Sequence, residues 1–158
     1  MLFSRTYKYQ SNMEIGAIKS NLLGKHVKVH NLDFEVLERD KMIKIIPHAE
    51  QNDNLKTLPI THVEFNGKGN TTQVIVSSKM RKIDKGGPLI VMTFCAFMLI
   101  AAILFMVLGK SDYEYFTYAL LGLSVGMFAL LWIRLESGYF DYIRKIRDYV
   151  KVQSAAAA

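Results

Sequence analysis

The sequence predicts an α+β fold: a small antiparallel sheet with one helix in its N-terminal half, then a two-helix transmembrane hairpin and a C-terminal amphipathic helix. Three observations predict this fold. Residues 1–85 alternate between apolar and polar types, as strands do. Two uncharged stretches of 20 and 19 residues follow at 89–108 and 115–133. Residues 137–153 then place charged and apolar side chains on opposite sides of a helix.

The composition supports a division between polar and apolar parts of the chain. Of 158 residues 51% are hydrophobic and 22% are charged, and the net charge is +6. These values coexist because the two kinds of residue are segregated along the chain, which excludes a single soluble globular domain. One cysteine and three prolines exclude a disulfide scaffold and a collagen-like repeat.

The first predicted strand lies near the N-terminus. Phe3, Tyr7 and Tyr9 share one face of it, and polar residues at 4, 6, 8 and 10 share the other. Because successive side chains of a strand point to opposite faces, the aromatic face is expected to pack on the core of the sheet.

A helix is predicted after this strand. Ser11 and Glu14 have the spacing of a capping box, and Gly24 is typical of the residue that follows a helix. Between them, apolar residues recur at the helical intervals i, i+3 and i+7, at Ile15, Ile18 and Leu22.

Five further strands are expected after the helix, which gives the order β-α-β-β-β-β-β and an antiparallel sheet with a helix on one face. Their predicted ranges are Val27–His30, Phe34–Arg39, Met42–Ile46, Leu58–Phe65 and Thr72–Met80. The predicted connections are a tight turn at Asp40–Lys41, a polar loop at 47–56 and a glycine-containing hairpin loop at 66–70.

The two uncharged stretches have the length of membrane spans. A helix of 20 residues extends about 30 Å, the thickness of the hydrocarbon core of a bilayer. Pro88 suits the first turn of such a helix and Gly109 its end, and Trp132 lies at the far end of the second stretch, where an aromatic belt would place it. We therefore expect a sheet domain at 1–85 and a helical hairpin at 88–135.

Basic residues predict the orientation of the hairpin. They flank its two outer ends and are depleted from the short connecting loop: Lys79, Arg81, Lys82, Lys85 and Arg134. Such residues face the cytoplasm and meet anionic headgroups. The N-terminus has no apolar signal segment. We expect a bacterial-type inner (plasma) membrane, with both termini cytoplasmic.

One face of the second span carries small residues, which allow close approach of another helix: Ala119, Gly122, Gly126 and Ala129. Gly122 and Gly126 form a G-x-x-x-G pair. Two interpretations are open: this face receives the first span of the same chain, or it receives another protein. The first is favoured, because the first span is tethered nearby.

The predicted C-terminal helix, 137–153, has an apolar side formed by Tyr139, Tyr142, Ile143, Ile146, Tyr149 and Val150. Three roles are open, in order of preference: packing on the sheet of the same chain, lying in the membrane interface, or holding a partner. The first would make the hairpin an insertion in one α+β unit. That order of elements resembles START-like helix-grip domains, and the resemblance carries no ligand site with it. Residues 154–158 are interpreted as a tag or an unassigned tail.

The sequence contains no recognisable catalytic or metal-binding motif, so we predict a protein that is not an enzyme, with no catalytic residues, no metal site and no cofactor. The histidines are His26, His30, His48 and His62, and their spacing matches no metal-binding motif. His26 and His30, four apart on a predicted strand, would lie about 13 Å apart. Cys95 is interpreted as a packing residue of the first span.

The partners expected from these features are the lipid bilayer and other membrane-protein subunits, with no nucleic acid. The spans hold no Asp, Glu, Lys, Arg or His, which disfavours a transporter or proton channel made by one chain. Their hydroxyls, at Thr93, Thr117 and Ser124, are expected to bond carbonyls of their own helix.

The predicted function is a non-catalytic two-pass accessory or scaffolding subunit of a larger membrane complex. The alternative is a membrane-anchored binding module for a lipid or other apolar small molecule. In that alternative the candidate lining is the Phe3, Tyr7 and Tyr9 face together with Phe34 and Val36.

Overall fold

The computed structural model describes residues 3–39, 42–48, 58–68, 71–108 and 113–155. Their contacts divide the chain into two compact units. The first, here called the sheet domain, comprises Met1–Arg81 and Gly138–Ala158, and the second, the helical hairpin, comprises Lys82–Ser137. The hairpin is thus inserted in the sequence of the sheet domain, between its last strand and its last helix.

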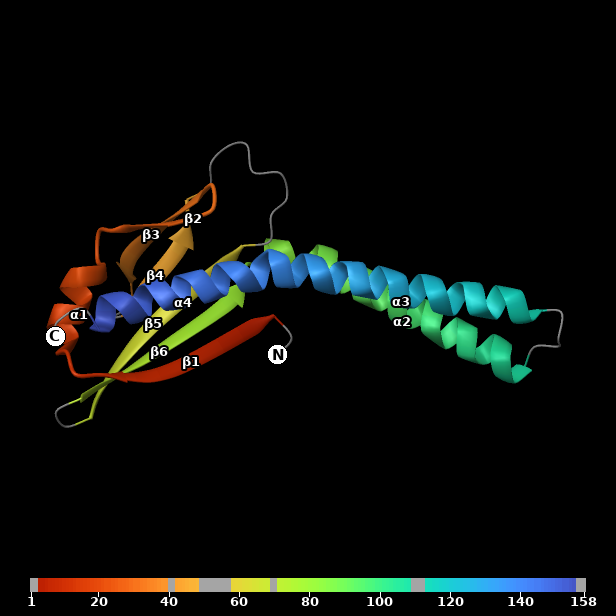
Figure 1. The fold of residues 1–158 in the computed structure, drawn as a ribbon, viewed down its shortest axis with the longest axis horizontal. Coiled ribbons are helices and arrows are strands. Elements are labelled where there is room, and N and C mark those ends of the chain that lie inside the picture. Colours follow the sequence, from red (N-terminus) through yellow and green to blue (C-terminus); the bar gives the residue numbers. More distant parts are fainter. Residues whose placement is uncertain (1–2, 40–41, 49–57, 69–70, 109–112, 156–158) are drawn as a thin grey trace. The chain divides into compact units, whose positions relative to one another are not determined.

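The sheet domain contains six strands in one antiparallel sheet (Figure 1). Its elements are β1 (Ser4–Ser11), α1 (Ile15–Leu22), β2 (His26–Val29), β3 (Leu32–Arg39), β4 (Met42–Pro47), β5 (Pro59–Lys68), β6 (Thr71–Met80) and α4 (Tyr139–Ala155). The spatial order is β1-β6-β5-β4-β3-β2, so the first strand of the chain pairs with the last. The predicted α+β fold and element order are confirmed.

Alternation of side chains along the strands builds one apolar face of the sheet. The apolar face continues from strand to strand because register partners are both apolar, as in the pairs Tyr7 with Val76 and Val63 with Val76. Ile43 pairs with Val63 in the same way. Because partners in an antiparallel pair point to the same side, these residues form a continuous surface.

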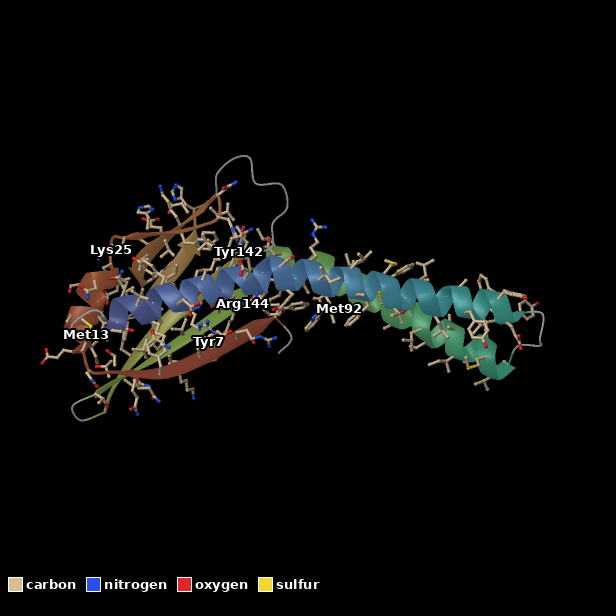
Figure 2. The ribbon with its side chains drawn as sticks, in the orientation of Figure 1. Tyr7, Met13, Lys25, Met92, Tyr142 and Arg144 are labelled. Carbon is tan, nitrogen blue, oxygen red and sulfur yellow. The ribbon has the colours of Figure 1, made fainter. Side chains whose placement is uncertain are left out.

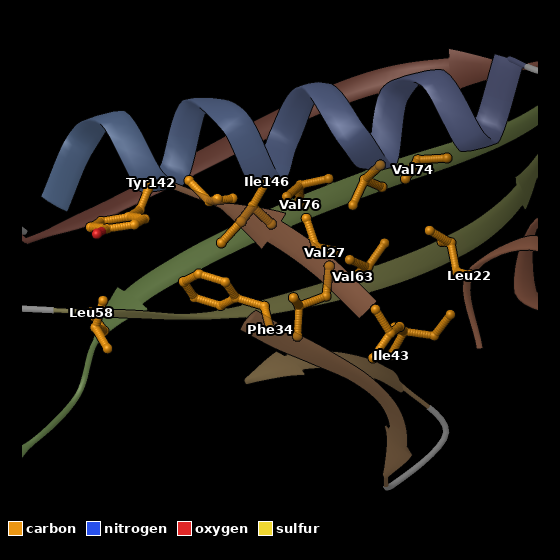
Figure 3. Packing of buried hydrophobic residues seen from close by; sticks show 14 of the residues in the cluster. Leu22, Val27, Phe34, Ile43, Leu58, Val63, Val74, Val76, Tyr142 and Ile146 are labelled. Carbon is orange, nitrogen blue, oxygen red and sulfur yellow. The ribbon is translucent and has the colours of Figure 1, made fainter. Parts of the chain in front are cut away.

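Helix α4 covers this apolar face and completes the core. Tyr142 and Ile146 point from α4 toward the sheet, where they meet Phe34 and Val76 (Figure 3). The buried cluster also includes Ile18 of α1, and its members are almost all fully buried. Burying a side chain of this size stabilises the fold by about 1.5–3 kcal/mol.

The end of α1 follows its sequence signals. The helix stops at Leu22, and Gly24 has a left-handed backbone with φ of 69°. Residues with a Cβ rarely adopt that conformation, which explains the glycine. The predicted capping-box bond is absent from the contacts of Glu14, whereas the Ser11 hydroxyl accepts the N–H of Met13 at 3.1 Å.

The β5–β6 hairpin differs from its prediction. The strands extend through Gly67, opposite Thr72, and end at the pair Lys68 and Thr71. Residues 66–68 of the loop expected at 66–70 are thus paired in strands. Gly69 and Asn70 lie outside the described residues, as does most of the predicted 47–56 loop. The predicted turn at Asp40–Lys41 also lies outside the described residues.

The helical hairpin contains α2 (Gly86–Leu108), preceded by the short 3-10 helix η1 (Ile83–Lys85), and α3 (Glu114–Ser137). Both long helices are long and apolar enough to cross a membrane. In the most apolar window of each, only 11% of the residues are buried. This low burial is not that of core helices in a soluble protein, and it is compatible with a membrane protein.

Candidate functional site

The two helices of the hairpin contact each other through a narrow set of small and medium side chains. Cys95, Met98 and Ala102 of α2 are buried, as are Thr117 and Ser124 of α3. The three residues of α2 are spaced by three and four, so they lie on one face of that helix.

A hydrogen bond joins the helices near the middle of this contact. The Ser124 hydroxyl donates to the Cys95 carbonyl at 2.9 Å, whereas the Thr117 hydroxyl donates at 3.0 Å to the carbonyl of Tyr113, which immediately precedes its own helix. Ser124 therefore departs from the expectation that the span hydroxyls bond their own helix. It can reach across because the small Cys95 brings the two backbones together.

Aromatic rings lie at the end of the hairpin near the connecting loop. Phe105 of α2 meets the rings of Tyr113 and Phe116, with centroids 6.0 and 5.4 Å apart. Tyr115 and Tyr118 are exposed there. In Figure 2 side chains stand out along both helices, Met92 of α2 among them. Most of those on the outer surface are apolar.

The small-residue face of α3 does not contact α2. Ala119, Gly122, Gly126 and Ala129 are exposed within the hairpin. A Cβ built on Gly122 or Gly126 would meet no atom within 4 Å in the described structure. The favoured interpretation, that this face receives the first span, is therefore corrected.

The geometry of a helix explains that correction. Gly122 and Ser124 are two residues apart, which is about 200° of rotation at 3.6 residues per turn. Because Ser124 faces α2, the glycines face away from it. The spacing of small residues identified a face of the helix, but Ser124 and Thr117 form an equally regular face on the other side, and α2 packs there.

The basic residues predicted to flank the membrane lie at the ends of elements. Lys79 is exposed near the end of β6, and Arg81 precedes η1. Lys82 and Lys85 begin and end the η1 turn, and Arg134 is exposed in the last turn of α3. Lys82, Lys85 and Arg134 belong to the hairpin, where the start of α2 and the end of α3 are the two termini of antiparallel helices.

The apolar side of α4 is occupied by the sheet of the same chain. The buried residues of that side include Tyr139, Tyr142, Ile143, Ile146 and Val150, and Tyr149 is partly buried against the core. This arrangement matches the first of the three roles considered for the helix. The face is consequently not free for a membrane surface or a partner.

The tyrosines of this interface keep their hydroxyls protonated. Burial raises the pKa of Tyr139 strongly, and raises the pKa of Tyr9 and of Tyr149 by less. The Tyr139 hydroxyl donates to the Phe3 carbonyl at 2.6 Å. These phenols are thus structural groups, held away from the range in which they could act as bases.

Four of the residues considered as a ligand lining belong to the core of the sheet domain or pack against it: Phe34, Val36, Tyr7 and Tyr9. Phe34 and Val36 are fully buried in the packed cluster, and Tyr7 and Tyr9 pack against its edge. The guanidinium of Arg147 lies 4.9 Å from the centre of the Tyr7 ring. These contacts assign the residues to packing.

The histidines are dispersed over the sheet domain. His26 Nδ1 lies 2.7 Å from Asp33, and His30 Nε2 lies 2.8 Å from Asp141. Burial, followed by Lys44 and Lys79, lowers the pKa of His62. His30 lies in the β2–β3 turn and not on the strand where it was expected. Among the described residues, His, Cys, Asp and Glu side chains form no group of three or more suited to a metal ion.

Sequence reasoning missed one structural residue at the end of α4. The helix runs to Ala155, and Ser154 is 1% exposed. The Ser11 hydroxyl donates to the Ser154 carbonyl at 2.6 Å. Ser154 and Ala155 of the segment interpreted as a tag or tail thus continue α4, and residues 156–158 lie outside the described residues. The apolar-charged periodicity ending at Val152 gave no signal for this contact.

No protein-family model matches the chain, and searches of curated proteins and of solved structures found no match either.

Proposed function

We propose that this protein is a non-catalytic accessory or scaffolding subunit of a membrane complex, and that it crosses the membrane twice. The observation that carries the proposal is the open small-residue face of α3. Gly122 and Gly126 have free space in front of them, although α2 already packs on the same helix. Close-packed membrane helices use such faces, because small side chains let two backbones approach.

The rest of the chain supports this interpretation. The spans carry no Asp, Glu, Lys, Arg or His that could form an ion pathway, and packed apolar side chains form the core of the sheet domain. A helix from another subunit is the partner that fits the α3 face. The membrane proposed is a bacterial-type inner membrane, with both termini cytoplasmic, because basic residues flank the outer ends of the spans.

Substitution of Gly126 by leucine tests the proposal. The space before Gly126 is open, so Gly126→Leu is expected to fold and insert as the wild type does. It should nevertheless lose proteins that co-purify with the wild type after gentle extraction from native membranes. Val125→Leu is the matched control, because Val125 is 61% exposed on a neighbouring part of the helix surface.

Two results would contradict the proposal. One is a wild-type chain that migrates alone at the mass of a single copy after gentle extraction. The other is a Gly126→Leu variant that retains every co-purifying protein in the amounts found with Val125→Leu.

A further inference from the structure

The β2–β3 turn meets the beginning of α4 in a cluster of three charged or titratable side chains. His30 Nε2 lies 2.8 Å from Asp141 Oδ2 and 2.9 Å from Lys145 Nζ. Lys145 Nζ also lies 3.0 Å from Asp141 Oδ2. Three atoms of three different residues are therefore all within hydrogen-bonding distance of one another.

These contacts cannot all be hydrogen bonds at the same time. Nε2 of an imidazole either carries a proton and donates, or presents a lone pair and accepts. An ammonium group only donates and a carboxylate only accepts. Nε2 can therefore accept from Lys145 or donate to Asp141, but it cannot do both.

We propose that His30, Asp141 and Lys145 form a proton-dependent contact between the β2–β3 turn and α4, here called the His30 clamp. With neutral His30, Lys145 donates to Nε2 and to Asp141. When His30 gains a proton, Nε2 donates to Asp141, and the imidazolium and the ammonium repel each other at 2.9 Å. Lys145 then leaves the imidazole.

The half-exposed His30 side chain rests on a buried residue of α4. The rings of His30 and Tyr142 form a T-shaped pair, with an interplanar angle of 89° and centroids 5.6 Å apart. Tyr142 packs in the core against Phe34 (Figure 3). The backbone of His30 has φ of 55°, a conformation set by the two-residue turn between β2 and β3.

The charges around His30 come from both elements. Helix α4 contributes Asp141 and Lys145, and also Arg144, whose guanidinium lies 3.8 Å from Asp141. The strands flanking the turn contribute Lys28 and Asp33, which are register partners, and Asp33 is engaged by His26. Lys145 is thus the cation in direct contact with the imidazole. Its charge determines whether protonation of His30 strengthens or weakens the contact between the turn and α4.

A double-mutant cycle on the full chain in detergent micelles tests the His30 clamp. His30→Asn keeps a side chain that tolerates positive φ, and Lys145→Met keeps the apolar stem without the charge. Unfolding would be measured at about pH 8 and about pH 5.5, on either side of the ordinary histidine pKa of about 6.5. At the higher pH the coupling should favour folding by a factor of about two to five in the unfolding equilibrium constant. At the lower pH it should vanish or reverse.

His26 supplies the matched control, because the partner of its imidazole among the described residues is Asp33 of β3. The cycle of His26→Asn with Lys145→Met should show no coupling at either pH. A His30–Lys145 coupling that is absent at both values, or equal at both, would overturn the proposal.

A second measurement on the folded wild type covers the case in which a variant fails to fold. Nitrogen chemical shifts of the imidazole reveal which ring nitrogen carries the proton. At about pH 8 the His30 proton should be on Nδ1, leaving Nε2 to accept from Lys145. A proton found on Nε2 at that pH contradicts the His30 clamp.

Discussion

The hydroxyl of Tyr139, the first residue of α4, donates a 2.6 Å hydrogen bond to the carbonyl of Phe3, just before β1. These residues are 136 positions apart in the sequence. The same carbonyl accepts the N–H of Met80 at the end of β6, at 3.3 Å. One carbonyl therefore ties together the starts of β1 and α4 and the end of β6.

The shared carbonyl sets the expected cost of Tyr139→Phe. The substitution removes one bond and leaves the Phe3 carbonyl with its bond from Met80, so it is not orphaned. The free energy of unfolding should fall by about 0.5–1.5 kcal/mol. Denaturant unfolding of the full chain in micelles measures this, and a loss well above 3 kcal/mol would show that the hydroxyl has a larger role.

High pH should weaken the same contact. Burial raises the pKa of Tyr139 above that of an unfolded tyrosine, about 10, so the folded state favours the neutral phenol. Its contribution to stability is fully present below about pH 10 and is lost as the pH rises from there through the folded pKa. Phenolate absorbance should show one late-titrating tyrosine fewer in Tyr139→Phe than in the wild type, because Tyr9 and Tyr149 keep their raised pKa values.

Ile146 is expected to be a main contributor to the packing of α4. Its side chain is fully buried between the helix and the sheet. Ile146→Ala should lower the free energy of unfolding by about 2–5 kcal/mol. Val152→Ala on the same helix is the control, because Val152 is 62% exposed and its truncation should change stability by less than about 0.5 kcal/mol. Equal effects of the two substitutions would mean that α4 does not pack as described.

Two glycines around α1 should respond to alanine with opposite signs. Gly24 has φ of 69°, so Gly24→Ala should destabilise the fold by about 1–2 kcal/mol. Gly16 is helical and has open space before it, so Gly16→Ala should stabilise by about 0.4–1 kcal/mol through the unfolded state. The comparison of the two unfolding midpoints is the measurement, and the same sign at both sites would contradict the backbone assignment.

The hydrogen bond between α3 and α2 predicts a modest loss in the hairpin. Ser124→Ala removes the donor to the Cys95 carbonyl, and such bonds between membrane helices average about 0.6 kcal/mol. Thr117→Val is the control, because among the contacts described the Thr117 hydroxyl bonds only the carbonyl of Tyr113, just before the start of α3. The free energy of unfolding of the chain in a lipid bilayer should therefore fall more for Ser124→Ala than for Thr117→Val.

The strands and helices could be predicted from sequence because their patterns are local. Alternation at Val74 and Val76 and the helical spacing of Ile18 and Leu22 each place neighbouring side chains on one face. The strand order could not be read in this way, because the pairing of β1 with β6 joins residues about 70 positions apart. The antiparallel sense and the covering helix follow from element order, whereas the register does not.

The candidate site could be predicted only in part. The small residues of α3 marked a surface for close helix packing, but a period of 3.6 also places Thr117 and Ser124 on a regular opposite face. Which face meets α2 depends on long-range packing that periodicity does not encode. The contact of His30 with Asp141 spans 111 positions and depends on a left-handed turn, and neither has a local signature.

The discontinuous sheet domain has a consequence for biosynthesis. Ribosomes synthesise β1 to β6 and then α2 and α3 before they synthesise α4. The apolar face of the sheet therefore stays uncovered until α4 has been made. During that interval α4 does not cover Phe34 and Val76, and exposed apolar surfaces of this kind promote aggregation. A chain that ends at Ser137 should therefore bind chaperones, whereas a chain that includes α4 should not.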